Sequence, residues 1–536
     1  MTAATVRNQW GMVLAVCLGF FMIMLDTTIV YVATPSILSG LHATFDQVLW
    51  VFNGYLLAYA VLLITAGRLG DLWGPRNLFV AGLVVFAAAS ALCGLSQDSN
   101  QLIAARVLQG VGGALLAPQS LTILTATFPP ERRGAVLGIW GGVIGLSTVA
   151  GPVLGGLIVT YADWRWIFFV NVPVGIVAVA AALAFIPDLR LGARHVMDPV
   201  GVVLASAALF GMVFGLIEGQ RYDWSAGIWA LIGSGALVGL VFLAWEARQR
   251  EPLIPLRLFR DRNFTLMNWT SLAVNFAMQG VFIPITIYTQ SVLGFSPLRS
   301  GLTVAPLSVA IAVVAPFAGR LADRFGGKYL LMAGLAIFGA ASAWIVLMAT
   351  TTSHQLDFLP AFAVGGLGIG LVFAPMTTIA LQRITAREAA SASAVLNTTR
   401  QLGSVLGGAV LGAVLQNRLA TELTSRAATA ADQLPGPFRK GFASGFAEAA
   451  KQGLRIGRGQ EGGFQPPAGL SPQLSRQLAL LVHDVFVSGY VAAMRPAVMV
   501  AVAVLALASV SCLGVVGRRR VPASGTTPAV VDNEAA

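Results

Sequence analysis

The sequence predicts an all-α membrane protein, and three observations carry that prediction. Hydrophobic residues make up 56% of the 536 residues and charged residues only 11%, whereas a soluble domain carries roughly 25% charged residues. Apolar runs of about 20 residues, the length of a helix that crosses a bilayer, follow one another along the chain. A ten-residue phrase occurs at 67–76 and again at 319–328, each time after an apolar run. This duplication at an offset of 252 residues predicts two similar halves and favours a transporter.

Fourteen apolar segments have the length and composition of membrane-spanning helices. In chain order they are approximately 11–38, 48–66, 78–96, 101–125, 134–160, 166–186, 199–217, 226–245, 265–291, 301–318, 329–350, 358–381, 390–415 and 490–516. Some exceed the roughly 20 residues that a bilayer requires, so we expect tilt or extension beyond it. The 59 glycines fit a bundle of closely packed membrane helices.

The basic residues give these segments a direction. With the N-terminus in the cytoplasm, the inner segments carry 20 Lys and Arg residues and the short outer loops carry three, which are Arg165, Arg221 and Arg299. A shift by one span would destroy this positive-inside asymmetry. The sequence therefore predicts a multi-pass protein of the cytoplasmic membrane with both termini in the cytoplasm. The net charge of +11 is then mostly a topology signal, and because the arginines are spread over loops we expect no nucleic-acid partner.

The long segment 416–489, between the last two spans, is expected outside the membrane. Two groups of its apolar residues recur at helical spacing: Phe438, Phe442 and Phe446, and Leu474, Leu478, Leu481 and Val485. We interpret both as amphipathic helices lying on the outer surface. The polar tail 517–536 lacks periodicity and is expected to be disordered in the cytoplasm.

Asp26, inside the first span, is the most informative charge in the sequence. An aspartate in the bilayer costs roughly 2.5–3.5 kcal/mol on insertion scales, so it is seldom there without a role. We expect it to lie away from cations and to exchange protons near neutral pH. The alternative is a carboxylate held by Thr27, Thr28 or the backbone for packing alone.

Arg106 is a second charge inside a predicted span, the fourth. A guanidinium does not deprotonate, so it must face a polar cavity or a partner. One interpretation is that it modulates a nearby acid or holds a water path. The other is a side chain that extends toward the outer end of the helix.

Polar side chains at three places are candidates for a substrate path. One face of the ninth span carries Asn268, Ser271, Asn275 and Gln279. Near the start of the thirteenth span are Asn397 and Arg400. Weaker candidates for a binding pocket are Trp50, Tyr55 and Gln119. A polar stripe should face a cavity or another helix, while a tryptophan at a membrane boundary is more often an anchor.

The repeated phrase is a charged, tight turn. Its glycines permit a sharp turn and close helix approach, Asp71 can face the positive end of a neighbouring helix, and Arg68 and Arg76 can pair across the loop. Contacts that form in one conformation and break in another make a gate; the alternative is an ordinary positive-inside turn. The gating candidates are Gly67, Arg68, Asp71, Gly74, Arg76, Gly319, Arg320, Asp323 and Lys328.

Glycines also crowd the fifth span around one proline. They are Gly141, Gly142, Gly145, Gly151, Gly155 and Gly156, with Pro152 among them. Glycine lets another helix approach closely, and Pro152 bends its helix by removing a backbone hydrogen bond. The segment is therefore a candidate hinge or a tight seal between halves, with ordinary glycine-rich packing as the alternative.

The sequence offers no sign of enzymatic chemistry. None of the three lysines belongs to a phosphate-binding loop, so we expect no ATP hydrolysis by this chain. Four scattered histidines form no metal set, and no Gly-x-Ser-x-Gly motif or pair of catalytic acids is evident. We expect neither a metal nor another cofactor.

Several of these patterns together resemble one family. They are the repeated phrase, Asp26 with the residues up to Pro35, Arg106 with Gln109 and Gly110, Gly151-Pro152 with Gly155-Gly156, and Trp164 to Phe168 with Asn171, Pro173 and Gly175. Over roughly 10–516 the chain resembles the major facilitator superfamily, and within it the fourteen-span drug:proton antiporters of the EmrB/QacA type.

The resemblance implies two six-helix bundles around a central cavity, with two inserted helices between them. On this sequence that division reads 1–190 for the first bundle, 191–250 for the inserted pair and 251–516 for the second bundle. It also implies export driven by the proton gradient, with Asp26 and Arg106 in the coupling network, and Gln109 of the fourth-span pattern is a candidate for the substrate cavity. Tyr31 stands where the family often has Asn, so it adds bulk near Asp26 and bears on substrate choice.

We therefore expect a proton-coupled antiporter that exports hydrophobic, cationic or neutral small molecules, and the sequence is compatible with a monomer. One alternative is an exporter of a lipid or an endogenous metabolite. A different class is a membrane receptor or scaffold, which has no need of a buried acid.

Overall fold

The computed structural model describes residues 9–128, 136, 143, 147, 150–188, 198–219, 221–249, 252, 254–325, 327–384, 389–452 and 472–516. Within these ranges the chain is helical and contains no strand. The expected tail 517–536 and the fifth-span glycines Gly141, Gly142 and Gly145 lie outside the described residues.

The first group of helices precedes residue 190. It comprises α1 (Gln9–Gly40), α2 (Phe45–Trp73), α3 (Pro75–Leu95), α4 (Ser99–Thr127), a helix over Ala150–Tyr161, α6 (Trp166–Phe169) and α7 (Asn171–Phe185). Next come α8 (Pro199–Glu218) and α9 (Ala226–Glu246). The remainder are η1 (Leu256–Arg260), α10 (Arg262–Ile287), η2 (Tyr288–Val292), α11 (Pro297–Phe325), α12 (Gly327–Met348), α13 (Gln355–Gly370), α14 (Phe373–Leu381), α15 (Ala389–Ala431), α16 (Gly436–Gln452), α17 (Pro472–Ser511) and η4 (Cys512–Gly514).

Local sequence signals explain where several helices begin. Asp98, Asp198 and Asp261 precede α4, α8 and α10, and each carboxylate accepts the backbone N–H three residues further on at 2.8–2.9 Å. These caps satisfy backbone donors that a helix cannot pair internally. Between α2 and α3, Gly74 has φ +86°, a backbone conformation that favours glycine, and Pro75 opens α3. The tight turn expected within the first phrase is therefore present.

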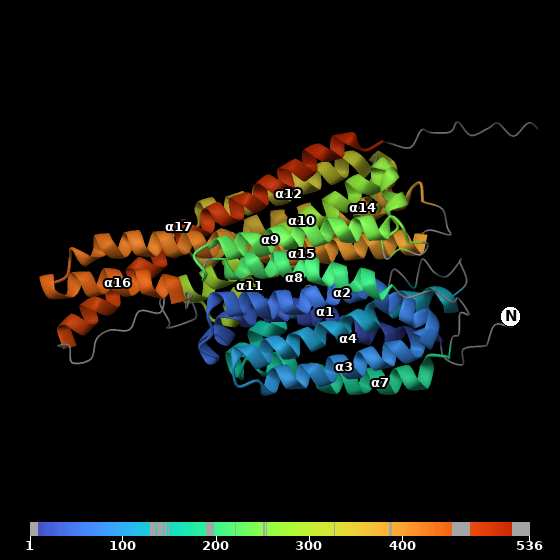
Figure 1. Ribbon diagram of the computed structural model, residues 1–536, viewed down its shortest axis with the longest axis horizontal. Coiled ribbons are helices and arrows are strands. Elements are labelled where there is room, and N and C mark those ends of the chain that lie inside the picture. Colours follow the sequence, from blue (N-terminus) through green and yellow to red (C-terminus); the bar gives the residue numbers. More distant parts are fainter. Residues whose placement is uncertain are drawn as a thin grey trace, which may run out of the picture.

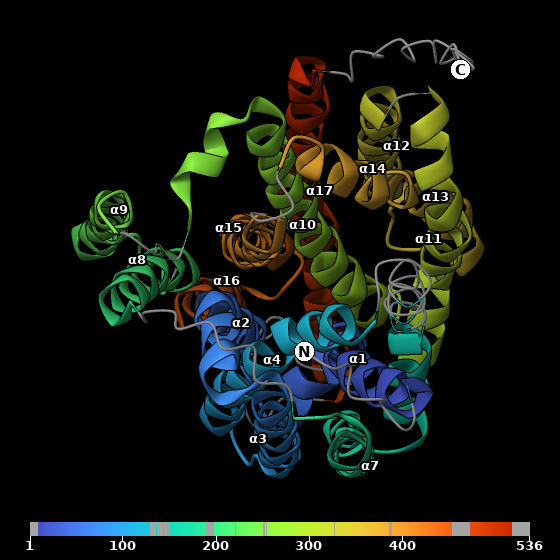
Figure 2. The ribbon, with the colours of Figure 1, turned by 90° about the vertical axis from the view of Figure 1, so that its right-hand side faces the viewer.

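The helices form two groups side by side. Figures 1 and 2 show α1 to α7 on one side and α10 to α17 on the other, with α8 and α9 at the flank. In the first group α4 packs against α2 and α3; in the second α13 packs against α11 and α12. Contacts between the groups run mainly from α2 to α15 and from α1 to α10.

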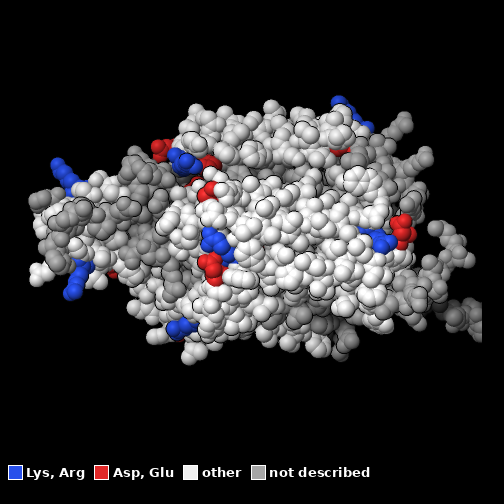
Figure 3. Space-filling view, turned by 90° about the horizontal axis from the view of Figure 1, so that it is seen from below, with Lys and Arg blue, Asp and Glu red and all other residues white. Residues whose placement is uncertain are grey.

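The two ends of the bundle differ. Gln9 and Val516 lie at one end, called here the terminal end, while α1 ends and α2 begins at the other, called the far end (Figure 1). Figure 3 shows one face of the molecule with a broad surface free of charged side chains between charged groups near the two ends. Such a band is what a bilayer requires of a multi-pass protein.

Twelve helical segments among the described residues are long and apolar enough to cross a membrane. They correspond to twelve of the fourteen predicted spans. Of the predicted fifth span, the structure describes a helix over Ala150–Tyr161, and the thirteenth forms the first part of α15. Fourteen spans stay a prediction.

The duplication seen in the sequence reappears in the packing of the helices. Gly82 and Gly334, like the two phrases, are 252 residues apart. A Cβ atom on Gly82 would lie 3.0 Å from the carbonyl oxygen of Gly112, and one on Gly334 would lie 2.7 Å from that of Gly368. Both glycines therefore let backbones touch at matching places, α3 against α4 and α12 against α13.

One predicted span is broken. The segment predicted at 358–381 forms two helices, α13 and α14, which are separated at Leu371 and Val372. Four glycines, at 365, 366, 368 and 370, precede the break. Glycine is among the weakest helix formers because it loses the most backbone freedom on folding.

The expectation of helices lying flat on the outer surface is wrong. Instead α15 runs on to Ala431, α16 folds back along it, and α17 begins at Pro472, so that these parts project beyond the far end (Figure 1). We call the end of α15 (416–431), α16 and the start of α17 (472–489) the projection. Its buried apolar side chains include Leu419, Leu423, Ala427, Phe442, Phe446, Leu478, Val482, Val485 and Phe486. The aromatic spacing thus marks a small core between helices.

Candidate functional site

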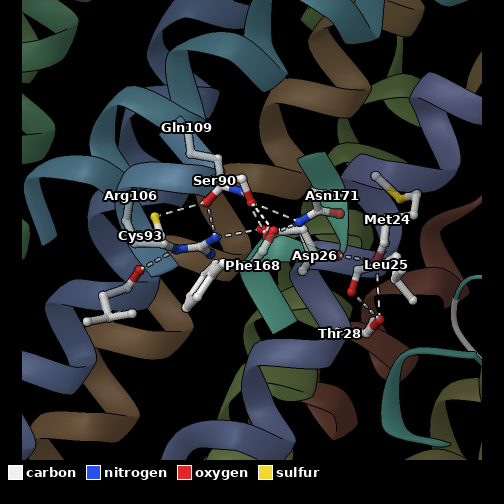
Figure 4. Close-up of polar contacts among 12 residues, drawn as sticks. Met24, Leu25, Asp26, Thr28, Ser90, Cys93, Arg106, Gln109, Phe168 and Asn171 are labelled. Atoms are coloured by element: carbon white, nitrogen blue, oxygen red, sulfur yellow. Dashed lines mark hydrogen bonds and ion pairs between the residues drawn. The ribbon is translucent and has the colours of Figure 1, made fainter. Parts of the chain in front are cut away.

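Asp26 lies at the centre of a buried polar site in the first group of helices. Its side chain is fully buried, and Arg106 Nη1 lies 2.5 Å from Asp26 Oδ2. The other carboxylate oxygen accepts hydrogen bonds from Gln109 Nε2 at 2.9 Å and Asn171 Nδ2 at 3.3 Å. Figure 4 shows these side chains converging on the carboxylate from α4 and α7. Three helices therefore meet at one charge.

The Arg106 side chain, like that of Asp26, makes several polar contacts. Its Nε donates to the carbonyl of Val51 at 3.2 Å and its Nη1 to Gln109 Oε1 at 2.7 Å. The guanidinium carbon lies 4.3 Å from the ring centroid of Tyr55, within cation–π range. Arg106 and Gln109 share a face of α4 because they are three residues apart. A buried ion pair is tolerated only when further hydrogen bonds satisfy it, which is the arrangement found here.

Three residues that the sequence analysis did not assign to the site complete it. Ser90 Oγ accepts from Gln109 Nε2 at 3.2 Å and from Asn171 Nδ2 at 3.0 Å, and donates to the carbonyl of Phe168 at 2.9 Å. The thiol of Cys93 lies 3.6 Å from Gln109 Oε1. Ser90 and Cys93 are single small residues in an apolar run, so no sequence signal marks them. Asn171 is different, because a polar residue at the start of an apolar helix is a signal that the sequence shows.

Three statements made about these charges from the sequence are corrected. The prediction that Asp26 lies away from cations is wrong, because Arg106 contacts it directly. The alternative that threonines hold Asp26 is not what the structure shows: Thr27 and Thr28 donate to backbone carbonyls of Met24 and Leu25 in their own helix. An Arg106 side chain extended toward a helix end is also excluded, since only 1% of it is exposed.

Tyr31 joins the site to the second group of helices. Its hydroxyl donates to Gln279 Oε1 of α10, and its ring stacks on Phe52 and Phe282 with centroids 5.0 and 5.9 Å apart. Tyr31 lies five residues after Asp26 on the same helix, about 8 Å along its axis. Two residues proposed separately for the substrate cavity therefore touch across the two groups.

The polar stripe of α10 is buried along its whole length. It comprises Asn268, Ser271, Asn275 and Gln279. Asn268 and Asn275 each donate to a carbonyl four residues earlier in α10. Asn268 Oδ1, Ser271 Oγ and Gln279 Nε2 have no hydrogen-bond partner within the described structure. Buried polar atoms of this kind are costly unless water or a ligand reaches them.

A small cavity lies beside this stripe, between α2, α10 and α15. Gln279 contributes its polar lining, and the other lining residues are apolar or glycine. Its volume is about 10 Å³, room for roughly one water molecule. In this conformation the described residues leave little space there.

Trp50 and Gln119, both proposed as pocket residues, serve as helix contacts. Trp50 Nε1 donates to Glu218 Oε1 of α8 at 3.1 Å, and its ring packs against Phe210 and Phe214. Gln119 Nε2 donates to the carbonyl of Ala66 at 2.9 Å and so ties α4 to α2. Gln119 is thirteen residues beyond Arg106, about 20 Å along α4. Neither side chain reaches the Asp26 site.

Asn397 and Arg400 lie on α15. Asn397 is exposed, and the guanidinium of Arg400 lies 5.2 Å from the ring centroid of Phe373 on α14. The pair therefore belongs to the second group of helices, whereas Asp26 and Arg106 belong to the first.

The gating candidates are only partly described. The side chains of Arg68, Asp71, Arg320 and Asp323, and the surroundings of Gly319, lie outside the described residues. A Cβ on Gly67 would lie 3.9 Å from Pro118, an ordinary contact.

The basic residues that close the two phrases have matching contacts. Arg76 Nη2 donates to the carbonyl of Leu183 near the end of α7 at 2.8 Å, and Lys328 Nζ to that of Leu513, just after α17, at 2.7 Å. A cation at a helix C-terminus is favourable. Each residue therefore ties its turn to the last helix of its own group, and the expected pairing of Arg68 and Arg76 across the loop stays a prediction, because the side chains of Arg68 and Asp71 lie outside the described residues.

The fifth-span residues seal the two groups together. A Cβ on Gly155 would lie 2.8 Å from Ile29 of α1, and one on Gly156 would lie 2.7 Å from the backbone of Leu298 in α11. Gly151 similarly faces Thr28, and the carbonyl of Pro152 faces Gly301. This segment therefore packs against both groups without room for larger side chains.

Comparison with known proteins agrees with this architecture. The model of the Major Facilitator Superfamily matches residues 16–408. The chain belongs to the major facilitator superfamily. It is 37% identical over 506 residues to the tetracenomycin C resistance and export protein of Streptomyces glaucescens, with 94% of this chain and 91% of that protein covered.

Two further proteins extend the comparison. The multidrug resistance protein Stp of Mycobacterium tuberculosis is 34% identical, with 75% of each chain covered. In fold, the chain is similar to a crystal structure of a bacterial homolog of the human lysosomal transporter Spinster, inward-facing and unoccupied. That likeness has a TM-score of 0.58 at 17% identity and covers 94% of this chain and 97% of the other.

Proposed function

We propose that this efflux transporter of the major facilitator superfamily exchanges protons for amphipathic or hydrophobic small molecules, which it exports from the cytoplasm. Relatives named for resistance and export support this direction. In the proposed orientation the terminal end faces the cytoplasm. The groups α1–α7 and α10–α17 act as two bundles. In the sequence, α8 and α9 are inserted between the two bundles.

One observation carries the proposal. The fully buried carboxylate of Asp26 lies on the same helix as Tyr31, which bonds to the other group of helices through Gln279. Protonation of Asp26 removes its charge and so weakens its hold on Arg106. Since α1 is held at Asp26 by α4 and α7 and at Tyr31 by α10, a change at the first contact alters the position of the second. A ligand shifts a conformational equilibrium only through such differential contacts.

The complete burial of the Asp26 carboxylate fits a role in coupling proton exchange to transport. With the carboxylate fully buried, a proton reaches it only when α1, α4 or α7 moves. Proton exchange is thereby tied to the conformational change that moves substrate, which is the requirement for antiport.

A transport assay tests this function. Full-length protein in proteoliposomes with an imposed pH gradient should export an amphipathic dye, and Asp26→Asn should abolish the response to the gradient. Thr27→Val is the matched control, since its hydroxyl bonds only within α1, and it should transport normally. Gradient-driven export at the wild-type rate by Asp26→Asn would remove Asp26 from the mechanism.

A further inference from the structure

Arg400 places a second guanidinium deep within the bundle. It lies eleven residues after Ala389, where α15 begins, which is about 16 Å along the helix axis. The thirteenth span is predicted to begin near residue 390, so Arg400 would lie close to the middle of a hydrocarbon core about 30 Å thick. A charged group there must face other protein or water, because lipid does not solvate it.

The surroundings of Arg400 are aromatic and come from both groups of helices. Its guanidinium lies 5.2 Å from the Phe373 ring centroid on α14 and within electrostatic reach of Tyr59 on α2. The Tyr59 ring stacks on Tyr55, which in turn lies against Arg106. Arg400 thus faces the boundary between the two groups and is only half-buried there.

Arg106 and Arg400 differ in their partners. Arg106 has the carboxylate of Asp26 at 2.5 Å and a bond to Gln109. For Arg400, no carboxylate lies within ion-pair distance among the described residues, and its contacts are aromatic. Two residues earlier in α15, the Thr398 hydroxyl is buried and lacks a hydrogen-bond partner within the described structure. An arginine this deep in the bundle calls for an anion from elsewhere.

We propose that Arg400 binds the acidic group of an amphipathic organic anion, a carboxylate or ionised phenol, whose hydrophobic body lies between Phe373 and Tyr59. This inference rests on the proposed function and names its substrate class. It differs from the sequence-based expectation of cationic or neutral substrates. The Asp26–Arg106 pair has no net charge, whereas Arg400 has no ion-pair partner among the described residues, and its positive charge attracts an anion and repels a cation.

Three probes with one ring system separate charge from hydrophobicity. They are pyrenebutanoate, its neutral methyl ester and a pyrenebutyl trimethylammonium cation. Binding is measured by fluorescence with the full-length protein in nanodiscs. We expect the wild-type protein to bind the acid at least about tenfold more tightly than the ester, and the cation most weakly. Equal binding of acid and ester, or preference for the cation, overturns the inference and leaves the proposed antiport standing.

Variants assign the preference to one residue. Arg400→Gln should remove the preference for the acid and leave ester binding within about twofold, while Arg400→Lys should keep part of it. Arg418→Gln, which removes an exposed arginine of the same helix, is the matched control and should change nothing. Loss of acid and ester binding together in a folded Arg400→Gln protein overturns the inference, because it would show a conformational role. If none of the probes binds to wild type, the substrate class is wrong, and antiport is still decided by the dye assay with Asp26→Asn.

Discussion

At the scale of single residues, Asp26 and Arg106 depend on each other. Both are buried, and each supplies the opposite charge that the other needs in the interior of the protein. Removing one partner of a buried ion pair typically costs about 3–5 kcal/mol, because the remaining charge is left uncompensated, whereas removing both is often nearly neutral. Stability and transport therefore respond differently to the same set of variants.

We predict that Asp26→Asn and Arg106→Gln each lower the melting temperature and abolish pH-driven export. The double variant should recover most of the stability, because no lone charge remains, and should still fail to export. Thermal melting in detergent and the proteoliposome assay measure the two effects, and the double-mutant cycle gives the coupling. If the double variant melted no higher than the less stable single variant, the pair would not be the source of the loss.

The sequence identified these two residues because a charge in an apolar run is costly and therefore conspicuous. It did not show that they touch. They are 80 positions apart, and no local pattern links α1 to α4. Tyr31 and Gln279, 248 positions apart, were likewise chosen separately and meet only in the fold. Polar composition marks which residues matter, but partners are set by helix packing.

At the scale of helices, glycine determines how closely neighbours approach. A Cβ on Gly112 would lie 2.6 Å from the backbone nitrogen of Phe86 in α3, and one on Gly368 would lie 2.6 Å from that of Phe338 in α12. A backbone cannot yield as a flexible side chain can. In both groups of helices, a glycine therefore lets two neighbouring backbones touch.

We predict that Gly112→Ala destabilises the protein even though alanine favours a helix over glycine by about 1 kcal/mol. The added methyl group must push α3 and α4 apart. Gly233→Ala on α9 is the control, since nothing lies within 4 Å of a Cβ there, and it should be neutral or stabilising. Thermal melting of both variants distinguishes them, and equal melting temperatures would contradict close packing at Gly112.

The projection supplies a second prediction for helices. Phe446 is fully buried in its small core, whereas Leu480 of α17 is 71% exposed. Replacing a buried phenylalanine by alanine typically costs about 3–5 kcal/mol. Phe446→Ala should therefore speed amide hydrogen exchange in 416–452 and 472–489, and Leu480→Ala should not. Unchanged exchange in Phe446→Ala would mean that the projection lacks a cooperative core.

Hydropathy predicted the helical segments well and their ends poorly, for one physical reason. Hydropathy reports which residues suit the bilayer. A helix can continue beyond its apolar stretch, as α15 does by extending to Ala431. It can also break within one, as between α13 and α14. Helix ends are decided by caps, glycines and packing partners, of which only the first two are visible in the sequence.

At the scale of the whole molecule, the described contacts between the two groups seal the far end. Gln290 Nε2 donates to the carbonyl of Val32 at 2.7 Å, and the backbone nitrogen of Leu298 donates to Thr160 Oγ1 at 3.0 Å. Both bonds join segments that lie near the far end of their helices. A transporter that alternates between two openings must break these bonds in each cycle.

A cross-link at this seal should stop the cycle. The hydrogen bond between Leu298 and Thr160 brings their backbones within reach of a disulfide, so Thr160→Cys combined with Leu298→Cys should form one on oxidation. We expect the oxidised protein to lose export and to regain it on reduction, because the far end can no longer open. Thr160→Cys alone, treated with the same oxidant, is the control and should export throughout, since the native cysteines Cys17, Cys93 and Cys512 are buried. Export at the full rate by a fully cross-linked protein would show that the far end does not open during transport, and the proposed exchange would then need another route for its substrate.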